Sequence, residues 1–213
     1  MAQNENAKKT TCTDQPGHGT VVDNITPRQK LVIAKGLLDY QYIMDNREKN
    51  DDDFQDVYYD FYLKARGEMW NVDHRSVYFE LLNGISPETT DLMGILTSLN
   101  EKLGSFEFSI GSKMLHTQNP SMPIYDSKVR EYLSKKEDVK LWWKIPNRES
   151  GARRGTREVE KITHDWDELC KWYDRLLHSS QGEKWINWFD DNFQDFAGIS
   201  NVKKVDFIIF ATN

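Results

Sequence analysis

The stretch SIGSKMLHTQNPSMPIYDSKVREYL, which runs from Ser109 to Leu133, decides how the rest of this chain is interpreted. Lys113 follows a glycine at the start of one helical pattern, and Asp126 follows the extended segment PIY at the start of the next. The first backbone N–H groups of a helix have no partner within it, and the helix dipole there favours an anion. The stretch therefore predicts two helices, the first of which begins with an anion-binding turn.

The turn around the glycine is expected to hold a nucleic-acid strand by its phosphates, because a residue without a side chain lets a phosphate approach the backbone closely. Contacts of this kind position a strand without reading its sequence. The residues predicted to make them are Ser109, Ile110, Gly111 and Ser112.

Lys113 and Asp126 each have an ordinary role and a chemical one. Lys113 can be a surface lysine, or an amine made nucleophilic by a helix N-terminus and basic neighbours. Asp126 is expected to cap the second helix. A capping carboxylate that also faces a cleft can stabilise a positively charged sugar carbon or activate a water molecule. The residues alone leave both roles open.

Helical signals precede this stretch. A helix is expected to begin at Pro27 with Thr26 as its N-cap, because proline suits the first helical position. Another is expected between Ser86, as its N-cap, and Gly104, at its C-cap. The apolar stripe of the first helix is predicted to consist of Leu31, Ala34, Leu37, Leu38 and Tyr42.

Helical signals also follow it. Ser200 is expected to cap a buried C-terminal helix, for which an edge strand is the alternative. The chain has no alternating strand pattern and no internal repeat, so an all-α fold of roughly eight helices is predicted. Residues 1–24 are predicted to form a polar tail and residues 25–213 a helical domain. A long helix is expected from about Thr156, with the apolar stripe Ile162, Trp166, Leu169, Trp172, Tyr173, Leu176 and Leu177.

Composition excludes several classes of protein. Hydrophobic residues at 38% and aromatic residues at 12% are enough for a core. The first residues lack the apolar segment of a signal peptide, and no apolar run approaches the roughly 18 residues that a membrane helix needs. A cytoplasmic protein with no membrane partner is therefore expected. Cys12 and Cys170 form no metal-binding set, and the histidines show no ligand spacing, so neither a metal nor a cofactor is predicted.

Charge is distributed unevenly along the chain, whose net charge is −6. Residues 109–161 hold 12 of the 28 lysines and arginines but only 7 of the 34 acidic residues. An acidic body with one basic region favours a polyanion at one place only. The alternative is a solvated surface with no such partner.

Residues 104–133 resemble the helix-hairpin-helix DNA glycosylase superfamily, whose hairpin reads L-P-G-V-G-x-K-x-A and is followed by P-V-D-T-H-V. Here FSIGSKML stands where the hairpin would, and MPIYDSKVREYL stands where the aspartate segment would. Phe108 replaces the hairpin proline, Ser109 its first glycine, and Lys128 the histidine after the aspartate. The connection from Lys113 to Asp126 is several residues shorter than is usual in that superfamily.

The resemblance implies an all-α enzyme of two helical lobes with a cleft between them. Asp126 would be the catalytic aspartate, and Lys113 the lysine of those members that also cut the strand as AP lyases. Such a monomer binds double-stranded DNA and flips a damaged or modified base into its cleft. The N-glycosidic bond then breaks through an oxocarbenium-like state that the carboxylate stabilises. The role would be repair or defence against modified foreign DNA, near the nucleoid in a bacterium.

Further residues are assigned to this expected site, and other functions remain open. For Trp142 and Trp143, ordinary core packing is the alternative. The rival functions are a non-catalytic helical DNA-binding module and a helical interaction protein in which Asp126 is only a cap. Only an enzyme needs Asp126 and Lys113 to line one cleft. The predicted base pocket is Tyr125, Thr117, Trp142 and Trp143, and the predicted phosphate contacts are Lys128, Arg130, Lys135, Lys136, Arg153 and Arg154.

Overall fold

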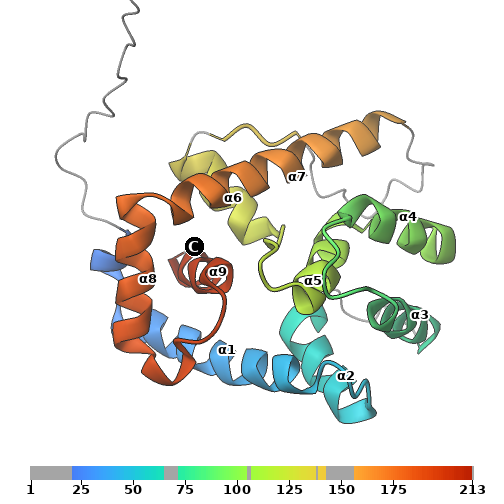
Figure 1. The fold of residues 1–213 in the computed structure, drawn as a ribbon, viewed down its shortest axis with the longest axis horizontal. Coiled ribbons are helices and arrows are strands. Elements are labelled where there is room, and N and C mark those ends of the chain that lie inside the picture. Colours follow the sequence, from blue (N-terminus) through green and yellow to red (C-terminus); the bar gives the residue numbers. More distant parts are fainter. Residues whose placement is uncertain (1–20, 65–71, 105–106, 138, 143–155, 213) are drawn as a thin grey trace, which may run out of the picture.

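The computed structural model describes residues 21–64, 72–104, 107–137, 139–142 and 156–212, and all regular secondary structure within these ranges is helical. The all-α prediction is therefore confirmed for the described residues (Figure 1). The first elements are η1 (Val21–Asn24), α1 (Pro27–Asn46), α2 (Asp52–Tyr58), the π-helical η2 (Tyr59–Leu63), α3 (Val72–Asn83) and α4 (Leu92–Leu103). They are followed by α5 (Phe108–Gln118), α6 (Ser127–Lys136), α7 (Thr156–Leu177), α8 (Ser180–Asn192), η4 (Gln194–Phe196) and α9 (Asn201–Thr212).

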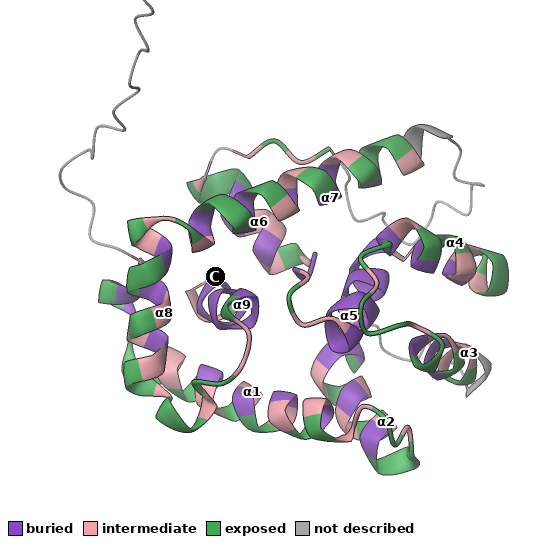
Figure 2. Ribbon diagram, in the orientation of Figure 1, coloured by how far each residue is buried: buried purple, intermediate pink, exposed green. Residues whose placement is uncertain are grey.

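The C-terminal helix α9 is central to one side of the molecule, where α1, α6, α7 and α8 pack around it (Figure 1). Residues 202–209 are all buried, as the colouring of Figure 2 shows. The Ser200 hydroxyl accepts a hydrogen bond from the Lys203 amide at 3.1 Å. The predicted cap and buried helix are thus confirmed, and the edge strand is excluded.

The helices α3, α4 and α5 pack beside this arrangement, with α4 against both of its neighbours. Gly104 ends α4 in the left-handed conformation, with φ at 73°, so the predicted C-cap is confirmed. Gly111 permits a close approach of α5 to α4, because a Cβ atom there would lie 2.6 Å from Cδ2 of Leu96. Helix packing therefore explains this glycine.

The helix α1 begins as predicted but buries a different face. Thr26 and Gln29 form a capping box, in which the Gln29 amide donates to the Thr26 hydroxyl at 3.3 Å. The predicted stripe is wrong in part: Leu37 is buried as predicted, but Leu31 and Leu38 are 70% and 65% exposed. Both faces of this helix are apolar, so contact with α2 and α9 decides which is buried. The buried residues are Ile33, Leu37, Tyr40 and Ile43.

The helix α4 begins later than predicted. Its N-cap is Asp91, whose carboxylate accepts a hydrogen bond from the Gly94 amide at 2.9 Å. Ser86 instead closes a local turn, in which the Thr89 amide donates to the Ser86 carbonyl at 3.0 Å. The prediction of Ser86 as the cap is wrong because two capping signals compete, and the one next to the apolar run begins the helix.

The helix α5 begins earlier than predicted, at Phe108. The Gly111 amide already donates to the Glu107 carbonyl at 2.8 Å, so Gly111 lies inside the helix and its amide is not open to a phosphate. The predicted turn at Gly111 is therefore wrong. Burial of Phe108 and Ile110 in the first turn accounts for the earlier start, since packing stabilises the added turn.

The long helix α7 has the predicted apolar stripe. Its residues Ile162, Trp166, Leu169, Trp172, Tyr173 and Leu176 are buried, and Leu177 is half-buried. This stripe covers α9 and continues into the contact with α8.

Some predictions lie outside the described residues, namely those for Trp143, Arg153, Arg154 and the tail up to residue 20. Residues 21–24 of the predicted tail form η1, which buries Val22. Within the described ranges, no helix combines the length and the apolar character that crossing a membrane would require.

Candidate functional site

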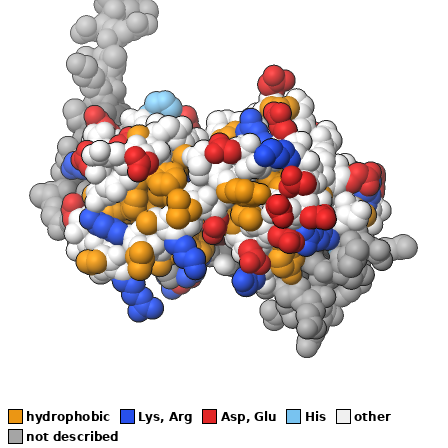
Figure 3. All heavy atoms as spheres, turned by 90° about the horizontal axis from the view of Figure 1, so that it is seen from below, with side chains coloured by type: hydrophobic (Ala, Val, Ile, Leu, Met, Phe, Trp, Pro, Cys, Tyr) orange, Lys and Arg blue, Asp and Glu red, His pale blue; other side chains and the backbone are white. Residues whose placement is uncertain are grey.

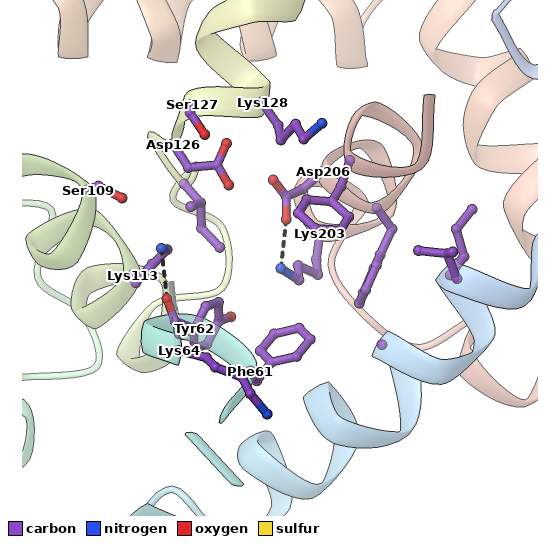
Figure 4. Close-up of a pocket in the computed structure, with 16 residues that line it drawn as sticks. Phe61, Tyr62, Lys64, Ser109, Lys113, Asp126, Ser127, Lys128, Lys203 and Asp206 are labelled. Atoms are coloured by element: carbon purple, nitrogen blue, oxygen red, sulfur yellow. Dashed lines mark hydrogen bonds and ion pairs between the residues drawn. The ribbon is translucent and has the colours of Figure 1, made fainter. Parts of the chain in front are cut away.

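A cavity of about 700 Å³ lies between α1, η2, α5, α6 and α9, and both Asp126 and Lys113 line it (Figure 4). The short connection between the two residues therefore does bring them to one place. The charged residues of the cavity are Asp126, Asp206, Lys64, Lys113, Lys128 and Lys203, and its aromatic residues are Phe61, Tyr62, Phe207 and Phe210.

Asp126 is the N-cap of α6, as predicted. Its backbone is extended, and its Oδ1 accepts a hydrogen bond from the Val129 amide at 2.9 Å. The side chain is half-buried and lines the cavity, so capping and exposure to a ligand occur together. A carboxylate held by a helix amide has a fixed orientation, which a reaction centre needs.

The segment before Asp126 is fixed by α5. The Ser112 hydroxyl accepts a hydrogen bond from the Tyr125 amide at 3.0 Å and donates to the Ser109 carbonyl at 3.0 Å. The Tyr125 ring stacks on Phe108 with centroids 4.0 Å apart. Ser112 and Tyr125 thus set the position of the adjacent aspartate.

A second anchor for this segment is His116. Its Nδ1 lies 2.6 Å from the Met122 carbonyl, and its Nε2 lies 3.1 Å from the Tyr40 hydroxyl. Burial lowers the pKa of His116 to about 3, with the Lys203 charge adding to this effect. A neutral imidazole that donates from Nδ1 accepts at Nε2, so Tyr40 donates to it.

The prediction that Lys113 lies at a helix N-terminus is wrong, because α5 begins at Phe108 and Lys113 lies in its middle. From there its side chain reaches across to η2. Its Nζ donates to the Tyr62 carbonyl at 3.0 Å and lies 6.0 Å from the centroid of the Tyr62 ring. The ammonium therefore joins α5 to η2 at the wall of the cavity (Figure 4).

The helix α9 adds a buried ion pair to the same cavity. Lys203 Nζ donates to Asp206 Oδ2 at 2.6 Å. In Figure 4 the Asp206 carboxylate faces that of Asp126. Burial raises the pKa of Asp126, and the negative charge of Asp206 raises it further; Lys113, the Val129 amide and Lys203 act in the opposite direction.

The aromatic residues form much of the remaining wall. Phe61 and Tyr62 come from η2, and Phe207 and the half-exposed Phe210 come from α9. The Tyr62 hydroxyl is buried and has no hydrogen-bond partner among the described residues, and burial raises its pKa well above the ordinary value. On the face where α1 lies, hydrophobic side chains gather with lysine and arginine side chains beside them (Figure 3).

The described residues of the predicted base pocket, Tyr125, Thr117 and Trp142, do not line the cavity. Tyr125 is fully buried, and its hydroxyl donates to Asp165 at 3.3 Å. Thr117 is also fully buried and donates to the Lys113 carbonyl at 2.8 Å. Trp142 is 55% exposed and stacks on His164 with centroids 3.5 Å apart. The sequence pattern could not show whether these residues belong to the core or to the cavity wall, because both are built from the same types of residue.

Only some of the residues predicted to contact phosphates lie at the cavity. Lys128 and Ser109 line the cavity, whereas Ile110, Gly111 and Ser112 are buried away from it. Arg130 is half-buried on α6, and Lys135 and Lys136 are exposed at the end of that helix.

Sequence reasoning missed the contribution of α9 and η2. Lys203 and Asp206 interrupt the apolar run VKKVDFIIF at a spacing that places them on one helix face. Because a buried helix rarely holds charges without a partner, this interruption was the available signal. The aromatic residues of η2 gave no such signal.

Within the described ranges, no group of three or more histidine, cysteine, aspartate or glutamate side chains could hold a metal ion.

Comparison with protein families, with characterised proteins and with solved structures gives no match for this chain.

Proposed function

We propose that this protein is a DNA glycosylase that hydrolyses the N-glycosidic bond of a flipped, damaged or modified base. The observation that carries the proposal is the half-buried Asp126 carboxylate, which caps α6 and lines an aromatic-walled cavity together with Lys113. A pre-oriented carboxylate beside a lysine in such a cavity suits a reaction in which positive charge develops on a sugar carbon.

The size and lining of the cavity agree with this substrate. A volume of about 700 Å³ lies within the range of small-molecule sites and can hold a nucleotide turned out of a duplex. Phe61, Tyr62 and Phe207 offer rings against which a base can stack, in place of the base-pocket residues expected from the sequence.

The reaction divides into binding and bond cleavage. Unstacking the base costs a few kcal/mol, which contacts in the cavity and with the DNA backbone offset. The bonding electron pair leaves with the base, and the carboxylate of Asp126 stabilises the cationic sugar. Water adds to the anomeric carbon, its proton passes to Asp126, and the departing base takes up that proton.

Lys113 offers a second route for the sugar carbon. In this route the Lys113 ammonium first gives a proton to Asp126, which passes it to the departing base, and the free amine bonds to the sugar carbon in place of water. The ring C–O bond then breaks, its oxygen takes up the proton that the nitrogen loses, and a Schiff base forms, from which strand cleavage can follow. This route requires Nζ to leave the Tyr62 carbonyl that it contacts in the free protein. The lyase activity is therefore a separate part of the proposal from base release.

The helices around the cavity would take part in binding the DNA. We interpret α4 and α5 as counterparts of the hairpin helices, and the cavity as part of a cleft between two helical lobes. Lys64 and Lys128, at the cavity, would contact phosphates, and Arg130 on α6 would add a third contact. The protein would act as a monomer in repair or in defence against modified foreign DNA.

A non-catalytic DNA-binding module is the second candidate, favoured by the hydrogen bond that makes Asp126 a helix cap. Duplexes that carry a panel of altered bases, treated with the protein and then with alkali, separate the two. A glycosylase yields strand breaks with the wild-type chain and none with Asp126→Asn, which keeps a capping side chain. Equal breakage by both proteins, with DNA binding intact, rejects the role of Asp126.

Lys113→Met gives the matched test of the lyase route. Borohydride trapping of a covalent complex with the wild-type chain, lost in this variant, supports a Schiff base at Lys113. Alkali-dependent breakage that survives in the same variant shows that water suffices for base release.

A further inference from the structure

The cavity holds a second carboxylate that the proposed mechanism does not use. Asp206, on α9, faces Asp126 (Figure 4), and both line the same cavity. The Asp206 side chain is 10% exposed, whereas that of its partner Lys203 is 3% exposed. Both residues line the cavity, and the carboxylate is the more exposed member of the pair.

Lys203 is held by rings as well as by the carboxylate. Its Nζ lies 4.8 Å from the centroid of Phe207, 5.0 Å from that of Tyr40, and 5.4 Å from that of Phe61. An ammonium placed over several aromatic faces is attracted to all of them and has little freedom to move. Its hydrogen bond to Asp206 therefore fixes the direction of that carboxylate.

Stability alone gives a weak reason for this ion pair. A buried pair of charges is often no more stabilising than apolar side chains of the same size. The neighbouring lysine of α9, Lys204, pairs with Asp190 of α8 at 2.7 Å; this pair does not line the cavity and provides an internal comparison.

Two carboxylates and four lysines, Lys128 among them, line the cavity. Asp126 and Asp206 face one another, and their repulsion contributes to the raised pKa of Asp126. Lys203 is buried beside Asp206, and Lys113 is bound to a backbone carbonyl. Lys64, with a 72% exposed side chain, is at the solvent side. A positive charge that develops between the two carboxylates would relieve their repulsion, which stabilises the transition state more than the ground state.

We propose that Asp206 is a second catalytic carboxylate, and that it and Asp126 lie on either side of the positive charge that develops on the sugar carbon. This inference rests on the proposed glycosylase function and refines it. Asp206 exchanges no proton in the reaction and contributes its negative charge, whereas Asp126 receives the proton of the attacking water. Lys203 is the positioning residue that orients Asp206.

The test uses two duplexes and does not require the identity of the base. One carries a pyrrolidine nucleotide, which mimics the cationic sugar, and the other carries a neutral tetrahydrofuran abasic nucleotide. The wild-type chain of 213 residues is expected to bind the cationic duplex more tightly. Asp206→Asn is expected to reduce that preference by about 10- to 100-fold, the effect of losing one hydrogen bond or contact to a charged group. Asp190→Asn, in the adjacent ion pair, is expected to leave it unchanged.

A second variant guards against misfolding, because Asp206→Asn leaves the buried Lys203 without its charged partner. The double change Lys203→Met with Asp206→Leu replaces the ion pair by apolar side chains of similar size, which folded proteins tolerate. This variant is expected to lose the preference while keeping affinity for the neutral duplex. A preference that persists in either variant, or that is absent from the wild type, overturns the role of Asp206.

Base release, measured separately, distinguishes the two proposals. Base release by the wild type without any preference for the cationic duplex keeps the glycosylase and rejects the paired carboxylates. An Asp206-dependent preference without base release from any duplex upholds the paired carboxylates as a cation site and rejects the glycosylase.

Discussion

At the scale of single residues, the raised pKa of Asp126 has a consequence for stability. The folded protein binds a proton at this carboxyl more tightly than the unfolded chain does, so its ionisation destabilises the fold as pH rises through the raised pKa. Asp126→Asn removes the charge and keeps a capping side chain. We expect this variant to melt at a higher temperature than the wild type at pH 7, and the difference to shrink in acid.

Thermal melts at pH 7 and at acid pH check this prediction. Asp91→Asn, at the N-cap of α4, is the matched control, because that carboxylate caps a helix without lining the cavity. It is not expected to raise the melting temperature. A wild-type chain more stable than Asp126→Asn at pH 7 would mean that the Asp126 carboxylate serves the fold and not a ligand.

For His116, acid is expected to destabilise the fold, which is the opposite of the effect expected for Asp126. Its pKa is lowered to about 3 in the folded protein, so the unfolded chain takes up a proton first as pH falls below about 6.5. The stability contributed by the neutral ring is present above that pH and is lost as pH falls toward 3. In His116→Gln, the free energy of unfolding should depend less steeply on pH over this range.

Chemical denaturation at a series of pH values gives the slope. His178→Gln is the control for replacing a histidine that is exposed. Equal slopes for the wild type and His116→Gln would contradict a neutral, buried His116.

At the scale of helices, Gly182 is the described glycine at which a side chain would meet the closest obstacle. A Cβ atom there would collide with the backbone carbonyl oxygen of Leu176, at the junction of α7 and α8. Gly182→Ala should therefore destabilise the protein by about 1–3 kcal/mol, the usual cost of overpacking. In thermal melts this corresponds to roughly 2–4 °C for each kcal/mol in a chain of this length.

Gly198→Ala is the matched control, because a Cβ atom at Gly198 would meet nothing within 4 Å. That change should be neutral, or stabilising by about 0.4–1 kcal/mol through the unfolded chain. If both variants melt alike, the junction of α7 and α8 is looser than its geometry implies.

Capping chemistry made several helix ends predictable, whereas the packed faces were harder to foresee. Thr26, Asp126 and Ser200 all cap as the sequence indicates, because a cap depends on neighbours within one turn. The buried face of α1 and the start of α5 depend on helices distant in sequence. Periodicity alone could not choose between two apolar faces of α1, and it could not show that Gly111 allows close packing against α4.

At the scale of the whole molecule, the candidate site combines residues from three distant parts of the chain. Asp126 and Lys113 were predictable because they lie in one short stretch with recognisable helix starts. Lys203 and Asp206 join them only because α9 packs against α6. No local pattern reports such a contact, although the charges within an apolar helix hinted at a special role.

The salt dependence of duplex binding tests whether the basic residues of the cavity face DNA. The logarithm of the affinity should fall linearly with the logarithm of salt concentration, and Lys128→Gln should lower that slope by about 1. Lys171→Gln, on α7 and not among the residues that line the cavity, should leave the slope unchanged. Identical slopes for the wild type and both variants would remove Lys128 from the DNA interface.

The central claim is that a base is cut from its sugar beside Asp126, and free base is the most direct product to measure. A pool of duplexes with different modified bases would be incubated with the wild-type chain, and released bases identified by mass spectrometry. We expect one base or a small set of related bases from the wild type, and at least a hundredfold less from Asp126→Asn at equal concentration. Release of the same bases at the same rate by Asp126→Asn would contradict the account.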